Sequence, residues 1–292
     1  MSDIATSHAG AASPASLSSV GAPPRPKLSP FRARRLPRER IWPAWLIILF
    51  QVGILLALIG GWEYAAETGA LDAFFWSRPS AIAETMVVFF RDGDALIDAW
   101  YTARATLLGF VLGTSVGTAW GLSFWWSRNY AAIVQPYIIC FESIPKLALA
   151  PLVILVFGIG LASKVALGVA LTVIVSALTT FSGVKAVDSD HERLMYSLGA
   201  SRWQVFSKLV VPACLPWGIS VLRVNIGLAL TGAVVGEFIS SQHGLGRAIL
   251  YAGQTYEIGL VWCAVAVLSA MSVVMYVAVS WLERLLLKHV RH

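Results

Sequence analysis

The chain has 292 residues, of which 57% are hydrophobic and only 13% are charged, and its formal net charge is +6 at pH 7. This composition excludes a soluble globular domain, in which about 25% of residues are charged. The positive charge does not indicate a nucleic-acid surface, because Lys and Arg stand at the ends of apolar segments rather than along one face. Their placement favours membrane orientation, so we expect a lipid bilayer and no nucleic acid among the partners.

The first 41 residues are rich in Ala, Ser and Pro and end in a basic run. Its basic residues are Arg25, Lys27, Arg32, Arg34, Arg35, Arg38 and Arg40. Because so polar a segment has little to bury, residues 1–41 are predicted to be a disordered tail that its charge keeps in the cytoplasm. We expect no cleavable signal peptide, since the polar lead is long and the next apolar stretch has spanning length. Residues 42–292 are predicted to form a transmembrane domain.

A helix needs about 20 apolar residues to cross a bilayer, and six stretches of the chain are long enough. They are residues 43–62, 101–126, 130–158, 163–184, 213–238 and 258–284. The third contains Pro136 and Pro145, so we expect it to be broken. Between the first two, the sequence 77–80 predicts a turn followed by a short helix. The predicted fold class is therefore an all-α membrane protein with six transmembrane helices.

The Lys and Arg residues between these stretches and at their ends are unevenly distributed. If the tail is cytoplasmic, most of them fall on the cytoplasmic side, in the tail, at Arg128, in 185–208 and at the C-terminus. Those left on the external side are Arg78, Arg91, Lys164 and Arg247. The positive-inside rule therefore predicts that both termini and the segment 188–208 are cytoplasmic.

Glycines recur every fourth residue in the second stretch, at Gly109, Gly113, Gly117 and Gly121. This spacing puts small residues on one helix face, where a neighbouring helix can approach closely. Gly227 and Gly232 in the fifth stretch are interpreted in the same way. The pattern predicts a packed bundle. We expect the three cysteines, Cys140, Cys214 and Cys263, to pack as small apolar side chains, since all lie in or beside apolar segments.

Charged residues inside apolar stretches are costly and often face a pathway or a watery cavity. Lys146 lies between two prolines, where irregular backbone is tolerated only if it is buried or lines such a pathway. Glu142, Pro145, Lys146 and Arg223 are therefore candidate translocation-pathway residues. The structural alternative, which we hold slightly ahead, is that Lys146 pairs with Glu142 and that Arg223 pairs or snorkels. Arg104 lies near a helix end and is interpreted as an anchor.

A charged loop between the fourth and fifth stretches has the pattern of a folded element. Ser189 and Glu192 fit a capping box, which would start a helix. Gly199 can take the left-handed conformation that ends it. Ser201 and Gln204 form a second capping box, so another helix is predicted to run from there toward a proline thirteen residues after the glycine.

This loop resembles the cytoplasmic loop of importer-type ABC permeases. That family has Glu-Ala-Ala, three residues, Gly, nine residues, then Ile-x-Leu-Pro. The sequences Gly199-Ala-Ser-Arg-Trp and Leu209-Val-Val-Pro match the glycine, the spacing and the proline. The Glu-Ala-Ala positions instead hold Arg193, Leu194 and Met195, with Glu192 one place early, so the family's acidic contact is not carried over.

Further segments, at 144–152, 157–160, 215–216, 222–223 and 244–246, are similar to the nitrate/sulfonate/taurine permease group. The resemblance covers about residues 70–285 and implies a type I ABC importer (MetI-like) fold. It implies a homodimer in the bacterial inner membrane, two separate ATPase subunits, an extracytoplasmic binding protein, alternating access and a small anionic solute. It also implies that 189–202 is the coupling helix. The coupling residues would be Ser189, Glu192, Arg193, Leu194, Tyr196, Leu198, Gly199, Ala200, Ser201 and Arg202.

Two other classes of protein were weighed. A self-powered secondary transporter or channel would show an inverted repeat or a train of titratable groups, yet Glu142 is counted as the only acid deep in a predicted span. No feature of the sequence supports the second class, a membrane scaffold without transport. No phosphate-cradling G-x-x-x-x-G-K-[ST] occurs, so ATP is expected on the partner ATPase and no cofactor on this chain. No catalytic residues or metal site are predicted.

Overall fold

The computed structural model describes residues 42–290, apart from the side chains of Ala73, His289 and Val290. The predicted tail, 1–41, lies outside the described residues. The chain divides into two compact units, residues 1–52 and 53–292. In the first unit, the described part is the start of α1, where the ring centres of Trp42 and Phe50 are 5.3 Å apart. Throughout residues 42–290 all regular elements are helical, which confirms the predicted class.

The helices follow one another in a simple order along the chain. They are α1 (Ala44–Glu67), α2 (Ala73–Trp76), α3 (Pro79–Arg91), α4 (Asp94–Ser123), α5 (Arg128–Ser143), α6 (Ala150–Phe157), α7 (Leu161–Lys185), α8 (Ser189–Ser197), α9 (Arg202–Val205), α10 (Val211–Ser220), α11 (Leu222–Ile239), α12 (Leu245–Gln254) and α13 (Ile258–Val290). Two short 3₁₀ turns, Phe124–Trp126 and Lys146–Leu149, and a π-turn, Phe206–Val210, complete the set. The predicted turn and short helix after residue 77 correspond to α3.

Five helical stretches of the described chain are long and apolar enough to cross a membrane. They are Ala44–Glu67, Asp94–Trp126, Leu161–Lys185, Leu222–Ile239 and Ile258–Lys288. A sixth span results if α5 and the pair Lys146–Phe157 are counted together, although the two parts meet at 79°. The predicted break is therefore confirmed, and it occurs at Pro145 rather than at Pro136, which lies inside α5. Because proline disfavours helical backbone in the residue before it, Ile144 is extended and α5 ends there.

The helix predicted to run from Ser201 toward Pro212 is present and continues beyond that proline. It passes through the π-turn Phe206–Val210 and continues as α10 and then, after one turn residue, as α11. Pro212 stands at the beginning of α10. A proline clashes with the carbonyl four residues before it and lacks the N–H to bond it, and a π-turn is one way to absorb that mismatch.

The predicted glycine face of α4 packs directly against α7. A Cβ added at Gly121 would lie 2.6 Å from the carbonyl oxygen of Ala177, and one at Gly109 would lie 3.1 Å from the Cα of Gly168. At Gly113 the added atom would collide with the Thr172 hydroxyl. The two backbones therefore approach more closely than any side chain on this face would permit, which confirms the predicted packing.

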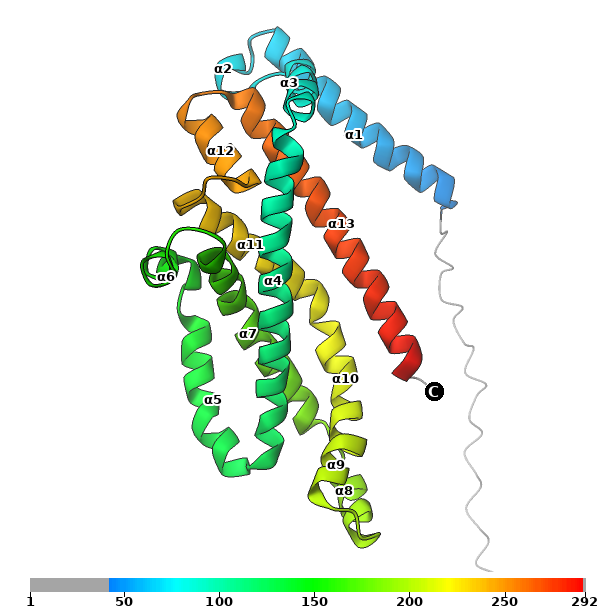
Figure 1. Cartoon of the computed structure of the whole chain (residues 1–292). Coiled ribbons are helices and arrows are strands. Elements are labelled where there is room, and N and C mark those ends of the chain that lie inside the picture. Colours follow the sequence, from blue (N-terminus) through cyan, green and yellow to red (C-terminus); the bar gives the residue numbers. More distant parts are fainter. Residues whose placement is uncertain (1–41, 291–292) are drawn as a thin grey trace, which may run out of the picture. The chain divides into compact units, whose positions relative to one another are not determined.

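The same prediction is right for one of the two glycines in α11 and wrong for the other. A Cβ at Gly232 would lie 2.7 Å from the backbone nitrogen of Gly168, so α11 also approaches α7 closely. Gly227 is exposed, and nothing lies within 4 Å of a Cβ added there. The three buried helices α4, α7 and α11 thus form the centre of the second unit, and Figure 1 shows them side by side.

The second unit has two distinct ends (Figure 1). At one end lie α8, α9 and the turn between α4 and α5; at the other lie α3, α12 and the start of α13. A cluster of buried apolar residues from α3, α4, α12 and α13 holds the second end together. It includes Cys263, and Cys214 is also buried, as predicted for packing cysteines; Cys140, in contrast, is exposed.

Candidate functional site

The loop 189–202 folds as two short helices joined at Gly199, whose φ of 82° confirms the predicted left-handed corner. Its first cap differs from the prediction. The residue that caps α8 is Asp188, whose carboxylate accepts a 2.9 Å bond from the backbone N–H of Asp190. This bond lowers the pKa of Asp188 below its ordinary value, since the N–H favours the ionised carboxylate. The predicted capping box at Ser189 and Glu192 is therefore wrong.

Glu192 has a different partner, because the indole N–H of Trp125 donates to its carboxylate at 2.7 Å. Trp125 belongs to the turn between α4 and α5, so this bond links α8 to the end of α4. The second capping box is present as predicted. The Ser201 N–H donates to the Gln204 side chain at 2.7 Å, and the Gln204 N–H donates to the Ser201 hydroxyl at 3.3 Å.

An aromatic cluster joins α9 to the same turn, and we call Trp125, Trp126, Trp203 and Phe206 the tryptophan clamp. The Arg202 guanidinium lies 5.5 and 5.1 Å from the ring centres of Trp125 and Trp126, and it donates to the backbone oxygen of Trp126. Such stacking restrains the guanidinium by cation–π attraction. Together with the Trp125–Glu192 bond, the clamp fixes both short helices to α4.

The other residues predicted in this loop face outward. Leu194, Tyr196 and Leu198 are 56%, 45% and 78% exposed. Ser189 and Arg193 are also exposed, and Arg193 makes a 3.4 Å surface ion pair with Asp190; Ala200 is half-buried in the corner between the helices. The loop therefore presents apolar side chains on a capped and anchored element, away from the rest of the chain.

The structure brings Glu142, Pro145 and Lys146 together at the break after α5. The Lys146 ammonium donates to the backbone oxygen of Glu142 at 3.0 Å and not to its carboxylate. Because Pro145 ends the helix here, the Glu142 carbonyl lacks its usual backbone N–H donor and accepts a bond from the lysine ammonium instead. Lys146 also lines a mostly apolar hollow of about 280 Å³ between α5, α6 and α7.

Arg223 lies elsewhere, because its guanidinium donates to the carboxylate of Glu283 on α13. This is the structural pairing that the sequence analysis had left open as the alternative to a pathway role. Glu283 is 7% exposed and lies within a predicted span, as does Glu237, which is 1% exposed. Each of these two acids is next to the last residue of its predicted span, so neither was counted among the acids deep in a span.

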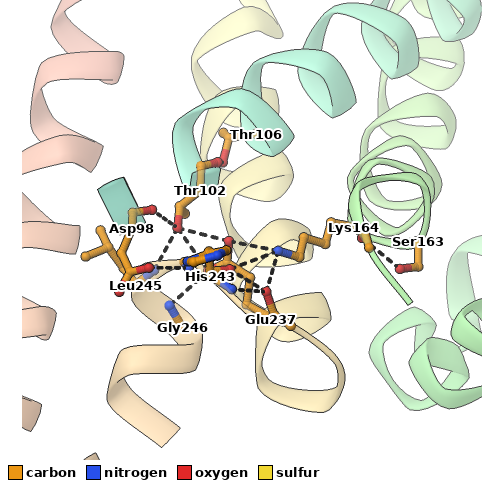
Figure 2. Close-up of polar contacts among 12 residues, drawn as sticks. Asp98, Thr102, Thr106, Ser163, Lys164, Glu237, His243, Leu245 and Gly246 are labelled. Carbon is orange, nitrogen blue, oxygen red and sulfur yellow. Dashed lines mark hydrogen bonds and ion pairs between the residues drawn. The ribbon is translucent and has the colours of Figure 1, made fainter. Parts of the chain in front are cut away.

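Glu237 is the centre of a buried polar site that the sequence analysis missed (Figure 2). Its carboxylate accepts from the Thr102 hydroxyl at 2.9 Å and from the Gly246 N–H at 2.9 Å. The Lys164 ammonium lies 3.6 Å away and is itself 5% exposed. Beside it, the Asp98 carboxylate accepts from the Gly244 N–H at 2.7 Å. We call these groups the Glu237 knot.

The knot ties four helices together, since its side chains come from α4, α7 and α11 and its N–H donors from the start of α12. Lys164 completes the link by donating to the Ser241 hydroxyl at 2.6 Å and to the His243 carbonyl at 3.1 Å. Lys164, counted above among the cations on the external side, is thus buried. Figure 2 shows the lysine and the carboxylate facing each other across this junction.

The Gly-Leu-Gly sequence at 244–246, noted above for its similarity to the permease group, has a specific role here. A Cβ at Gly246 would lie 2.8 Å from the Cβ of Glu237, and one at Gly244 would collide with the carboxylate. Both positions must therefore be glycine for the backbone N–H groups to reach the two acids. An acid inside a span with Gly-x-Gly seven residues later was the available signal.

Comparison with known proteins identifies the family to which this chain belongs. Residues 106–292 match the family described as binding-protein-dependent transport system inner membrane component. The chain belongs to this family. It is the permease component of an ABC importer, and the named relatives are transport components rather than enzymes.

Two relatives and one solved structure illustrate the permease's similarity. The formylaminopyrimidine transport permease protein ThiX of Halalkalibacterium halodurans is 32% identical over 237 residues, which cover 80% of this chain and 92% of ThiX. The taurine transport system permease protein TauC of Escherichia coli is 28% identical over 253 residues, which cover 83% and 90%. An inward-facing structure of the MetNI methionine ABC transporter has the same fold, with a TM-score of 0.55, 18% identity and coverage of 65% of this chain and 94% of that one.

Proposed function

We propose that the permease forms the translocation pathway of an ATP-driven importer for a small anionic solute, such as nitrate, a sulfonate or taurine. A binding protein outside the cytoplasm delivers the solute, and two copies of this chain work with two ATPase subunits that bind the ATP. The family description supports the role of a binding protein, and the similarity to TauC supports a sulfonate-like solute. The similarity to ThiX supports other small solutes as the alternative.

The observation that carries the coupling half of this proposal is the loop 189–202. A surface that transmits force must be rigid and must present side chains to which a partner can bind. Asp188 and Ser201 cap its two helices, and the tryptophan clamp fixes them to α4. Leu194 and Leu198 leave large apolar side chains exposed, which supports docking in a groove of another subunit.

The proposed cycle uses this stiffness. ATP closes the ATPase dimer and draws the two 189–202 segments together, and α4 moves with them because Trp125 and Trp126 belong to the turn that ends it. α4 and α7 are in backbone contact along the glycine face, so they move as one body and the pathway opens outward. Hydrolysis and release of the ATPase dimer then reset it. Both termini and 189–202 are cytoplasmic in this scheme, as the distribution of Lys and Arg predicts.

Pathway residues are proposed at the break in the third span. Lys146 and Glu142 lie there beside backbone that is not helical, an arrangement that suits a solute path. Arg223 is assigned a structural role instead, because the Glu283 carboxylate neutralises it.

The test is to purify the permease from membranes with its ATPase and to compare Leu198→Asp with Leu198→Met. The aspartate puts a charge on the proposed docking surface, whereas methionine keeps it apolar. We expect the ATPase to copurify with the methionine variant and with the unchanged chain, and to be lost with the aspartate variant. Retention of the ATPase and of ATP-dependent uptake by Leu198→Asp would contradict the docking role. Uptake that persists without any ATPase would instead favour a self-powered transporter or a channel.

A further inference from the structure

Beside the Glu237 knot lies a hollow of about 340 Å³, open on one side. It lies between α4, the start of α7 and the loop before α12, on the side of the bundle away from α8 and α9 (Figure 1). Its lining residues are Tyr101, Arg104, Ile159, Gly160, Leu161, Lys164, Ser241, Gln242 and His243. We call it the Arg104 hollow. Its size is at the lower end of the range for small-molecule sites, about 300–1,000 Å³.

The charges around the hollow are unequal. Its wall contains two cations, Arg104 and Lys164, and no carboxylate. The Lys164 ammonium is already satisfied, because it bonds Ser241 and the His243 carbonyl and faces Glu237. The second acid of the knot, Asp98, accepts a backbone N–H from Gly244 and does not line the hollow. Neither acid is therefore available at the wall to neutralise another cation.

Arg104 is the charge without a counter-ion. Within residues 42–290 no carboxylate lies within ion-pair distance of its guanidinium, although Arg104 stands inside a membrane-spanning helix. A charge in such a helix is expensive unless it faces water or a partner, and Arg104 faces the hollow. Guanidinium groups bind planar or tetrahedral oxyanions with two parallel hydrogen bonds.

The rest of the wall suits a small polar guest. The Tyr101 and His243 rings, which also line the hollow, are stacked at 4.8 Å with 16° between their planes, which gives a flat, rigid surface. Gln242 and Ser241 add polar atoms from the loop that Lys164 holds in place. The knot therefore acts as the support that holds this loop at the wall of the hollow.

We propose that the Arg104 hollow is an anion-binding site that takes a small oxyanion of the sulfonate, nitrate or carboxylate class, with Arg104 as its counter-ion. The assignment of this anion as transported solute rests on the proposed function. The charge selectivity of the site itself does not. The Glu237 knot holds the loop 241–243 in position, so the site depends on Glu237 although this acid does not line the hollow.

The test measures the charge selectivity of the hollow directly. A single reactive cysteine is placed in it by Gln242→Cys in a Cys140→Ser background, because the other two cysteines are buried. The full-length chain, in its complex in native membrane, is treated with an anionic sulfonatoethyl and a cationic trimethylammonioethyl methanethiosulfonate. The ratio of the two labelling rates is compared with the ratio for a free thiol.

We expect Arg104→Gln to lower the anionic-to-cationic ratio about tenfold. One unit charge about 6 Å from the reacting sulfur changes each rate about threefold in opposite directions in bulk water, and more where water is excluded. Arg104→Lys keeps the charge and should keep most of the ratio. The matched control is Arg247→Gln, since Arg247 stacks on Tyr251 near the same end but does not line the hollow.

Binding itself is tested by protection of the cysteine. Ethanesulfonate at millimolar concentration should slow labelling by an uncharged reagent when Arg104 is present and not in Arg104→Gln, and the neutral methanesulfonamide should not protect. A labelling ratio unchanged by Arg104→Gln, or equal protection by the two compounds, would overturn the site. If the cysteine is not protected but ATP-driven uptake is intact, the anion site is refuted and the importer proposal stands. If the cysteine is protected but uptake does not depend on an ATPase, the anion site stands and the importer proposal is refuted.

Discussion

Replacing Glu237 by glutamine should destabilise the bundle more than any other isosteric change in the described chain. The carboxylate accepts hydrogen bonds from Thr102 and Gly246 and faces the Lys164 ammonium. A glutamine offers one oxygen and an NH₂ group, so at least one donor would face another donor. The Lys164 charge would at the same time lose its counter-ion inside the protein.

The size of the effect follows from burial. The side chains of Lys164 and Glu237 are 6% and 0% exposed, so solvent cannot replace the missing partner. Removing one member of a buried ion pair costs about 3–5 kcal/mol. With about 2–4 °C of melting temperature per kcal/mol for a chain of this size class, Glu237→Gln should lower the melting temperature by about 6–20 °C.

The assay is the melting temperature of the purified permease in detergent, at one fixed scan rate because unfolding of such proteins is commonly irreversible. Lys164→Met should also destabilise, and the double variant should lose less than the two single variants added together, since neither charge is then unpaired. The control is Glu67→Gln, an exposed acid, which should stay within about 0.5 kcal/mol. A shift for Glu237→Gln as small as that of the control, or strict additivity in the double variant, would refute this reasoning.

Three further predictions concern other parts of the chain. Gly117→Val should force α4 from α7 and reduce the yield of folded permease in fluorescence-detected size exclusion, whereas Gly227→Ala should leave it unchanged because the space there is open. Trp125→Phe removes the indole donor to Glu192 and should lower solute transported per ATP hydrolysed, while Glu192→Gln, which still accepts that bond, should not; equal ratios in both variants would exclude the link. The Asp188 cap has a folded pKa below its unfolded value of about 3.9, so its contribution is present above that pH and is lost as the pH falls through the folded value. Asp188→Asn should remove this acid sensitivity of α8 while keeping the cap, as followed by the fluorescence of the adjacent tryptophans; an identical acid transition in both proteins would argue against it.

Much of the fold could be predicted because its signals are local. The apolar spans, the break at Pro145, the corner at Gly199 and the cap at Ser201 each depend on residues within a few positions of one another. The glycine face of α4 was predictable for the same reason, since one helix turn brings its members together. Gly227 shows the limit of that reasoning: a small residue in a span indicates a close contact only if a neighbouring helix lies on that face.

The charged sites could not be predicted in the same way. Glu192 satisfies the local rule for a capping box, yet its partner is Trp125, 67 residues earlier, and Asp188 caps the helix instead. Glu237 bonds Thr102, 135 residues away, and the Gly-x-Gly that follows it was the one local signal of a partner.

The sequence by itself determined that this is a helical membrane protein of a recognisable permease group, because spanning length, helix caps and short motifs are properties of neighbouring residues. Only the tertiary structure decided which charges within the bundle neutralise each other. Lys164 with Glu237 and Arg223 with Glu283 are both pairs between different helices. The physical reason is that a buried charge must find its counter-charge wherever packing brings one within reach, and that distance in space is not encoded in any local pattern. Arg104, which packing leaves facing an open hollow, is the exception that the structure brought to light.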